Sequence, residues 1–443
     1  MSPSIARQFA RFACSESLLP EPVIHAAYRA MLDTLGAMIA GGAHSATRRV
    51  AAAQPCHPGQ ATLTTGGSAD AEAAAVINGM AAHVWDMDDT SYTGIMHGSA
   101  VLLPAILAMA QERGSRADEI CRAFVVGSEI AYTLAELCTH AHYFHGWWST
   151  VTFGLTGTVA AAGVLLALDE DQMTAALGMA AAASGGGKAV FGTDAKPLLV
   201  GQAARQAISL ARMAKAGLTG PEQGFEDPRG YLALLNGDTV NRAALGTLGQ
   251  RWRLVTPGLL FKTNPVCSAA HAAIDQMQGL MRRLEAEPTE ITEIRAEVPE
   301  LVDISLVYPD PQTPQQAQFS LPYAMACVAR HGRVRFADLS PEALTDPETR
   351  RVMAKVTVTR AADLSTPEMR KKFPESARLT VKLTSGAEAS GFCGSARGMP
   401  DNPQTDTELI TKFEAACAYA GLCGPIEVRL GDNPATTLAR LLA

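Results

Sequence analysis

The chain has 443 residues, of which 47% are hydrophobic and 18% are charged, and its formal net charge at pH 7 is −7. This composition excludes a largely disordered protein, because the apolar fraction is large enough to form an extensive core. The negative charge and the lack of a basic run argue against nucleic acid as a partner. A local group of lysines could still bind a small anion.

The sequence predicts a cytoplasmic protein with reduced thiols. The N-terminus has no continuous apolar run of the kind found in signal peptides, and the nine scattered cysteines include no C-x-x-C pair. The uncharged run 147–168 is long enough to cross a bilayer. Its glycine, serine and threonine content instead favours a buried core helix, so we expect no membrane association.

Up to about residue 240 the sequence predicts an almost uninterrupted series of helices, because apolar residues recur at steps of three and four. The predicted helices span 22–41, 68–86, 99–113, 117–139, 151–168, 170–184 and 198–216. Asp169 and Gln172 form a capping-box pattern at the start of one of them.

After about residue 267, alternating apolar and polar residues predict strands with one buried face. The strand patterns span 291–298, 352–359 and 379–383, with a hairpin at 378–393 that turns at Ser385-Gly386, and helical patterns span 268–285, 320–332 and 404–421. We therefore predict a mainly α protein with an α+β second domain. A large all-helical domain comprises residues 1–266, to which 404–443 return, and a smaller α+β lid domain comprises residues 267–403.

Residues 86–90 (Asp-Met-Asp-Asp-Thr), followed by His97, concentrate polar side chains at the end of an apolar helical pattern. Carboxylates are costly to bring near a core unless something pairs with them. The cluster is therefore either a helix end held by hydrogen bonds or a polar pocket in which protons move. Asp88 and Asp89 fit either interpretation, whereas His97 can exchange a proton near neutral pH.

Four further segments combine glycine, histidine, lysine or aromatic residues. They are 146–154, which follows His140, His142 and His145; 185–197, which holds two lysines; 261–271; and 319–323. The three histidines lack a nearby carboxylate ligand, so we predict no metal site there.

Taken in order, these motifs make the chain resemble the MmgE/PrpD family, which includes 2-methylcitrate dehydratase, cis-aconitate decarboxylase and iminodisuccinate epimerase. The resemblance covers roughly residues 5 to 425 and rests on 78–83 with 86–90, His97, 146–157, Lys196-Pro197, Lys262 with Pro265, and 319–323. It implies the architecture given above, usually in a homodimer, and chemistry that uses no metal ion and no cofactor.

The resemblance also implies a site for a small anionic carboxylate, a di- or tricarboxylate. His97 is the expected acid/base and Asp86 its partner. Lys196 and Lys262 are the expected carboxylate-binding cations. Such cations also stabilise the enolate-like charge that develops when a proton leaves a carbon next to a carboxylate.

Thr90 is expected to line the site, and Tyr323 is expected to donate a hydrogen bond from the lid. The activity expected first is dehydration of the 2-methylcitrate dehydratase type. An epimerase of the iminodisuccinate type is the alternative, and a catalytically degenerate binding protein is the third reading.

The chain departs from the family at two histidines. Trp148 stands where members commonly carry a histidine, and His145 could replace that histidine only if the loop folds differently. Cys267 stands where the decarboxylases carry a histidine. These three residues are expected to contact the substrate. The changes argue against cis-aconitate decarboxylase itself and predict a substrate that is smaller or less charged than a tricarboxylate.

Overall fold

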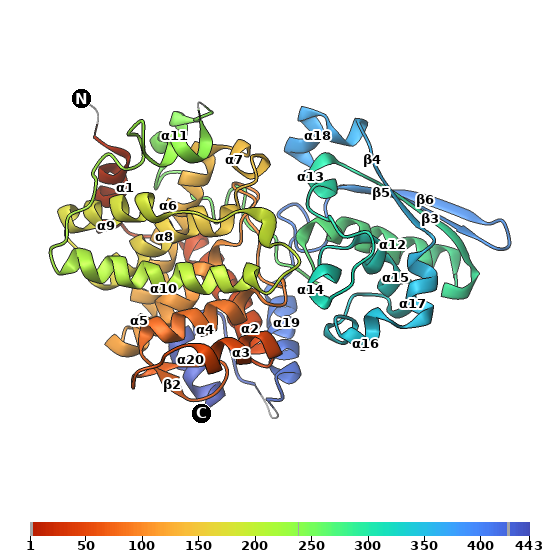
Figure 1. The fold of residues 1–443 in the computed structure, drawn as a ribbon, viewed down its shortest axis with the longest axis horizontal. Helices are drawn as coiled ribbons and strands as arrows, with labels where there is room; N and C mark the ends of the chain where they lie inside the picture. Colours follow the sequence, from red (N-terminus) through yellow and green to blue (C-terminus); the bar gives the residue numbers. More distant parts are fainter. Residues whose placement is uncertain (1–2, 238, 423–425) are drawn as a thin grey trace.

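The structure is a computed structural model that describes residues 3–237, 239–422 and 426–443. A helical lobe and a smaller lobe with a sheet lie side by side, and they confirm the predicted fold class (Figure 1). The helices of the first lobe are α1 (Ile5–Cys14), α2 (Glu21–Gly42), α3 (Ser45–Ala53), α4 (Ala71–His83), α5 (Gly98–Arg113), α6 (Ala117–Cys138), α7 (Ala141–Phe144), α8 (Ser149–Leu165), α9 (Glu170–Ala183), α10 (Ala195–Lys215) and α11 (Tyr231–Asn236).

Local signals explain most of these boundaries. The predicted capping box of Asp169 and Gln172 is present at the start of α9. The helix predicted over 68–86 begins only at Ala71, because Asp70 caps it and the two preceding residues form β2 (Ser68–Ala69), which pairs with β1 (Ala61–Thr62). Most of the uncharged run 147–168 forms α8, which is buried along most of its length. Within the described part of the chain, no helix is long and apolar enough to cross a membrane.

Two glycines bring α4 and α10 into backbone contact. A Cβ atom added at Gly79 would lie 2.6 Å from the Cα of Gly201, and one added at Gly201 would lie 2.2 Å from a carbonyl oxygen of α4. Only glycine permits so close an approach. Because Gly79 lies near the end of α4 and Gly201 near the start of α10, the contact brings His83 and Lys196 together.

The second lobe is a four-stranded sheet with helices packed on it. Its elements are α12 (His271–Leu284), β3 (Ile291–Val298), α13 (Glu300–Asp303), α14 (Pro314–Ala317), α15 (Leu321–His331), α16 (Pro341–Leu344), α17 (Pro347–Met353), β4 (Val356–Arg360), α18 (Pro367–Lys372), β5 (Ala377–Leu383) and β6 (Glu388–Cys393). The strand order is β4-β3-β5-β6, and only the β3–β4 pair is parallel.

The alternating patterns located this sheet with one error. The predicted hairpin is formed by β5 and β6, and Gly386 in its turn has a φ of 88°. The strand predicted over 352–359 begins only at Val356, because Asp346 caps α17 and Pro347 occupies its first turn, so that Val352 and Met353 remain helical.

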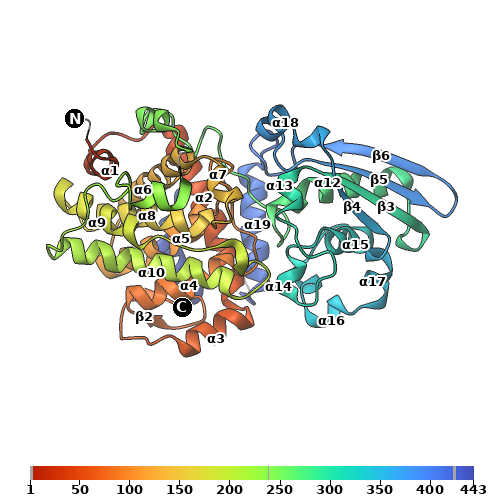
Figure 2. The same ribbon diagram turned by 45° about the horizontal axis from the view of Figure 1, so that its top comes forward.

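After the sheet, the chain runs back along the helical lobe. Helix α19 (Asp406–Tyr419) lies beside α2 at the junction of the lobes (Figures 1 and 2). Lys412 Nζ on α19 donates a 2.6 Å hydrogen bond to Asp33 on α2. Helix α20 (Pro434–Leu442) follows and buries Leu438 in the helical core. The eight described cysteines are free thiols, and Cys423 lies outside the described residues.

Candidate active site

The segment between α4 and α5 carries most of the side chains predicted to do chemistry. Asp86 adopts a left-handed backbone conformation with a φ of 50°, which aspartate tolerates better than most residues. Thr90 forms an antiparallel bridge with Leu260, with N···O distances of 2.9 Å in both directions. This bridge brings Lys262, two residues further on, next to Asp86.

Asp86 is shared by the two predicted lysines. Its Oδ1 accepts a 2.6 Å hydrogen bond from Lys262 Nζ and lies 3.3 Å from Lys196 Nζ. Lys262 Nζ also donates to the backbone carbonyl of Asp86 at 2.9 Å, which holds the left-handed conformation. All three side chains are buried.

Burial and ion pairing act against each other in this group. Burial raises the pKa of the Asp86 carboxyl, but the two ammonium groups outweigh it and hold that pKa well below its usual value. Burial lowers the pKa of Lys196. Burial also disfavours the charged form of Lys262, but the charges of Asp86 and Asp88 outweigh this effect and raise the pKa of Lys262. Asp86 is therefore an anion that keeps Lys262 charged inside the protein.

His83 connects the lysines to a second carboxylate. Its Nδ1 lies 2.9 Å from both carboxylate oxygens of Asp88, and Lys196 Nζ donates to its Nε2 at 2.6 Å. Burial lowers the pKa of the His83 imidazole. Because a carboxylate only accepts hydrogen bonds, neutral His83 carries its proton on Nδ1. His83 and Asp88 thus form a histidine–carboxylate pair next to Lys196.

His97 presents an unprotonated nitrogen to this cluster. Its Nδ1 lies 2.9 Å from the backbone carbonyl of Asp89, so Nδ1 must donate and Nε2 is left bare. Nε2 lies 3.9 Å from Asp86 Oδ1. Burial, with Lys262 adding to it, holds the pKa of His97 well below its ordinary value. The predicted pairing with Asp86 is a looser contact, because the Asp89 carbonyl orients the ring, and Thr90 Oγ1 lies 3.2 Å from Nδ1.

Aromatic rings surround the ammonium group of Lys196. Its Nζ lies 5.4 Å from the ring centre of Trp148, 5.5 Å from that of Phe191 and 5.0 Å from that of Phe319. Trp148 is 1% exposed, and its ring centre lies 5.5 Å from that of His83. The indole therefore contributes an apolar wall beside the histidine and the lysine.

Cys267 borders the cluster from the second lobe. Burial, followed by the charges of Asp86 and Glu375, raises the pKa of its thiol to about 12. It is therefore a neutral thiol at physiological pH.

The structure does not bring Tyr323 and His145 to this group. Tyr323 lies on the buried face of α15, and its hydroxyl donates to the backbone carbonyl of Asp338 inside the lid core. In this structure the hydroxyl is therefore engaged within the lid, and its predicted donation to a substrate stays a prediction. His145 directly follows α7 and is exposed, so it does not take the place of the missing histidine next to Trp148.

The sequence interpretation assigned no role to His83, Tyr92 or Glu375, and it left Asp89 open between a helix end and the pocket. His83 belongs to the 78–83 motif used for the family resemblance, and the aspartate five residues after it was an available signal. Asp89 lies behind the site and accepts from Ser99, and burial raises the pKa of its carboxyl well above the usual value. Tyr92 and Glu375, whose side chains form a hydrogen bond, had no local signal because 283 residues separate them.

Four side chains of the acid/base cluster could in principle bind a metal ion. One ligand atom from each of His83, Asp86, Asp88 and His97 lies within 4.8 Å of the others. However, Lys262 and Lys196 already donate to Asp86 Oδ1 and His83 Nε2, so a divalent cation would displace or face two ammonium groups. The donor set therefore fits bound protons and lysines better than a metal ion.

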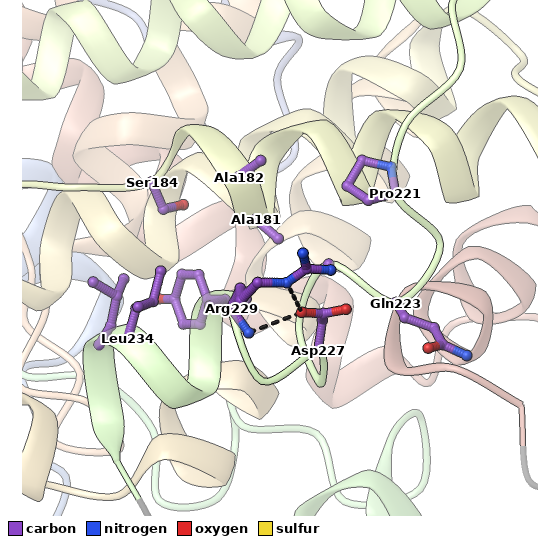
Figure 3. Close-up of a pocket in the computed structure, with 12 residues that line it drawn as sticks. Ala181, Ala182, Ser184, Pro221, Gln223, Asp227, Arg229 and Leu234 are labelled. Atoms are coloured by element: carbon purple, nitrogen blue, oxygen red, sulfur yellow. Dashed lines mark hydrogen bonds and ion pairs between the residues drawn. The ribbon is translucent and has the colours of Figure 1, made fainter.

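A separate cavity of about 490 Å³ lies at the edge of the helical lobe, between the end of α9 and α11. Figure 3 shows the Asp227–Arg229 pair, in which Asp227 Oδ1 lies 2.8 Å from the backbone nitrogen and 3.3 Å from Nε of Arg229, near Ala181. Among the described residues its lining includes no histidine or lysine. This cavity thus lacks the acid/base groups found between the lobes.

Comparison with known proteins gives the family. Residues 7–243 match the MmgE/PrpD N-terminal domain and residues 265–422 match the MmgE/PrpD C-terminal domain. Cis-aconitate decarboxylase of Homo sapiens is 26% identical over 414 residues, which cover 90% of this chain and 84% of that protein. The protein of the same name from Mus musculus is 24% identical over 417 residues, with coverages of 90% and 83%.

A third relative is the cis-aconitate decarboxylase-like protein oryM of Aspergillus oryzae. It is 25% identical over 369 residues, which cover 77% of this chain and 74% of that protein. The two domain matches together span most of the sequence and both lobes. The chain therefore belongs to the MmgE/PrpD family.

Proposed function

We propose that the protein is a lyase that dehydrates a small hydroxy di- or tricarboxylate, in the manner of 2-methylcitrate dehydratase. In this proposal His97 Nε2 removes the proton from the carbon next to a carboxylate, and the β-hydroxyl then leaves as water. The observation that carries the proposal is the bare Nε2 of a neutral histidine next to two buried lysines. The family membership and the lyase names of the relatives support it.

The lysines would perform two tasks. They would bind the substrate carboxylate, and they would stabilise the enolate-like charge that develops when the proton leaves. Asp86 supports both tasks, because its negative charge favours the protonated form of each lysine, which burial disfavours.

Charge balance favours a substrate with few negative charges. The cluster contains the ammonium groups of Lys196 and Lys262 and the carboxylates of Asp86 and Asp88. Two cations and two anions cancel, so each further substrate carboxylate adds uncompensated negative charge. A dicarboxylate would therefore bind with a lower electrostatic cost than a tricarboxylate, in agreement with the apolar wall formed by Trp148.

Substrate binding would require the lobes to separate locally. The cavity that adjoins Lys196 has a volume of about 10 Å³. The helical lobe lines it with His83, Val84, 192–194, Lys196 and Pro197, and the second lobe lines it with Gln315, Gln318 and Phe319. A single water molecule needs about that much space. The loop before α10 and the segment around Phe319 would have to move apart to admit a carboxylate.

The test is turnover in deuterated water, followed by NMR, with malate, citrate, 2-methylcitrate and cis-aconitate as probes. Dehydration predicts an unsaturated acid from a hydroxy acid. Deuterium incorporation without loss of water would identify the epimerase alternative, and carbon dioxide release from cis-aconitate would identify a decarboxylase. Stabilisation of the protein by these acids without any turnover would indicate a binding protein.

The pH dependence of kcat/KM should show how far the site lowers the pKa of the base. His97 acts in its neutral form, and its pKa is held well below 6.5. We therefore expect kcat/KM to show no loss from protonation of this base as the pH falls through 6.5, and to decline only at lower pH. An acid limb centred at or above pH 6.5 would contradict this assignment of the base.

Trp148→His should change the substrate preference. The variant replaces an apolar wall beside Lys196 with a ring that can accept or donate a proton. We expect the ratio of kcat/KM for citrate to that for malate to rise by about tenfold, the effect of roughly 1.4 kcal/mol. An unchanged ratio would show that Trp148 does not contact the substrate.

A further inference from the structure

We infer that Glu375 holds the proton that Tyr92 delivers to the hydroxyl group leaving the substrate. The inference rests on the proposed function, and it adds an acid to the base already described. Glu375 would act through Tyr92, so it is a proton-holding and positioning residue.

Glu375 links the two lobes in a buried position. It lies between α18 and β5, is 1% exposed, and its Oε2 accepts a 2.8 Å hydrogen bond from the hydroxyl of Tyr92 in the helical lobe. Its Oε1 accepts a 2.8 Å hydrogen bond from Ser268 Oγ. Ser268 directly follows Cys267, so both partners come from segments that border the acid/base cluster.

Tyr92 is the more accessible end of this pair. It is partly exposed, as are His97 and Cys267, whereas Glu375 is enclosed. Lys262 and Asp86 both act electrostatically on the Glu375 carboxyl, and Ser268, which donates to that carboxyl, follows Cys267 at the border of the cluster. We assign the transfer of the Glu375 proton to the Tyr92 hydroxyl, because this hydroxyl lies 2.8 Å from Glu375 Oε2 on a residue that is itself partly exposed.

The surroundings keep Glu375 protonated over part of the neutral range. Burial, with a smaller contribution from the Asp86 charge, raises the pKa of its carboxyl to about 7. The hydrogen bonds from Tyr92 and Ser268 and the charge of Lys262 lower this pKa but do not outweigh burial. Burial and the Glu375 charge hold the pKa of Tyr92 well above 10, so Tyr92 is a neutral hydroxyl that can relay a proton. Cys267, with a pKa of about 12, is not an efficient donor at neutral pH.

The proton balance of the step is complete. His97 Nε2 takes the proton from the α-carbon, the carbon–carbon double bond forms, and the bond from the β-carbon to the hydroxyl oxygen breaks. When Glu375 is protonated, it donates across the same 2.8 Å contact to the Tyr92 oxygen, and the Tyr92 O–H turns to the substrate. The departing hydroxide takes the proton of the Tyr92 hydroxyl and leaves as water, while Tyr92 takes the proton of Glu375. The step ends with protonated His97 and ionised Glu375, and both are reset by exchange with solvent.

The test compares two rates in the same enzyme, exchange of the α-proton with deuterated water and loss of the hydroxyl from malate or citrate. Glu375→Gln keeps the size and a hydrogen-bonding side chain but cannot supply a proton. We expect it to slow the loss of hydroxyl by about 10²-fold, while exchange continues at the wild-type rate. Tyr92→Phe should behave in the same way.

Ser268→Ala is the matched control, because it removes the other hydrogen bond to the same carboxylate and leaves the path to Tyr92 intact. It should retain both rates below pH 7, and because the Ser268 hydrogen bond lowers the pKa of Glu375, its removal should move the alkaline limb of kcat/KM to higher pH. In the wild type, kcat/KM should also fall above pH 7 as Glu375 ionises, and this limb should be absent in Glu375→Gln. The inference would be overturned if Glu375→Gln and Ser268→Ala slowed exchange and hydroxyl loss to the same extent. It would also be overturned if neither variant slowed the loss of hydroxyl.

A second measurement does not depend on turnover. Infrared difference spectra should show the carbonyl stretch of a protonated carboxyl that titrates near pH 7 and disappears in Glu375→Gln. Absence of this band would overturn the inference even if the enzyme dehydrates its substrate. A wild-type enzyme that shows the band but neither exchanges nor eliminates would instead refute the proposed function.

Discussion

His97→Asn is expected to lower kcat/KM by about 10²- to 10⁴-fold, the usual contribution of a positioned general base. The asparagine amide can still donate to the Asp89 carbonyl that orients the His97 ring, but it has no counterpart of Nε2. The fold should therefore survive while proton removal fails. The measurement is the steady-state rate with whichever probe acid the wild type converts.

His25→Asn is the matched control for this variant. His25 lies on the surface of α2 and contacts Asp406, far from the cluster in sequence and exposed to solvent. It should leave kcat/KM unchanged. A His97→Asn enzyme that retains more than about a tenth of the wild-type rate would assign the base to another group, and His83 would be the next candidate.

Asp86→Asn is expected to lower the free energy of unfolding by about 3–5 kcal/mol, because removal of one partner leaves buried charges without compensation. Lys262 and Lys196 would both lose the carboxylate that lies 2.6 Å and 3.3 Å from them. The left-handed backbone at Asp86 would also lose part of the contact that holds it. Denaturant unfolding of both proteins at pH 7.5 measures the difference.

Two comparisons make this result specific. Asp363→Asn removes a carboxylate from a surface pair with Arg378, in which Asp363 is 62% exposed, and should lower the free energy of unfolding far less than Asp86→Asn does, because solvent screens an exposed pair. Adding Lys196→Met to Asp86→Asn removes one of the stranded charges and should recover part of the lost stability. Equal costs for the buried and the surface substitution would contradict the ion-pair account.

Much of the fold was predictable because helices and strands leave different periodicities. The helices that form the walls of the site, such as α8 and α10, lie within a few residues of their predicted bounds. The error at 352–359 arose because a short helix and a strand follow one another without a glycine, and the alternation of Val356–Arg360 was extended backwards.

The site was predictable where its residues fall into ordered motifs. Asp86, His97, Lys196 and Lys262 come together as the resemblance implied. Tyr323 does not, because nothing in a sequence shows whether a tyrosine on a lid helix faces the cleft or its own core, where it bonds to Asp338.

The contacts that could not be predicted from the sequence are those between distant segments. The Tyr92–Glu375 hydrogen bond joins the two lobes, and the His83–Lys196 contact depends on how closely two glycines let α4 and α10 approach. Such contacts are set by packing, which follows from the whole fold rather than from local spacing. They decide which ammonium group meets His83 and which hydroxyl meets Glu375.

A crystal structure with bound succinate, a dicarboxylate that has no hydroxyl group to lose, tests the central claim most directly. We expect one carboxylate of this ligand within about 3 Å of Lys196 Nζ and Lys262 Nζ, and an adjacent carbon facing His97 Nε2. The loop before α10 should have moved away from the segment around Phe319. Succinate bound only outside this cluster, or no binding at millimolar concentration, would contradict a carboxylate site between these lysines.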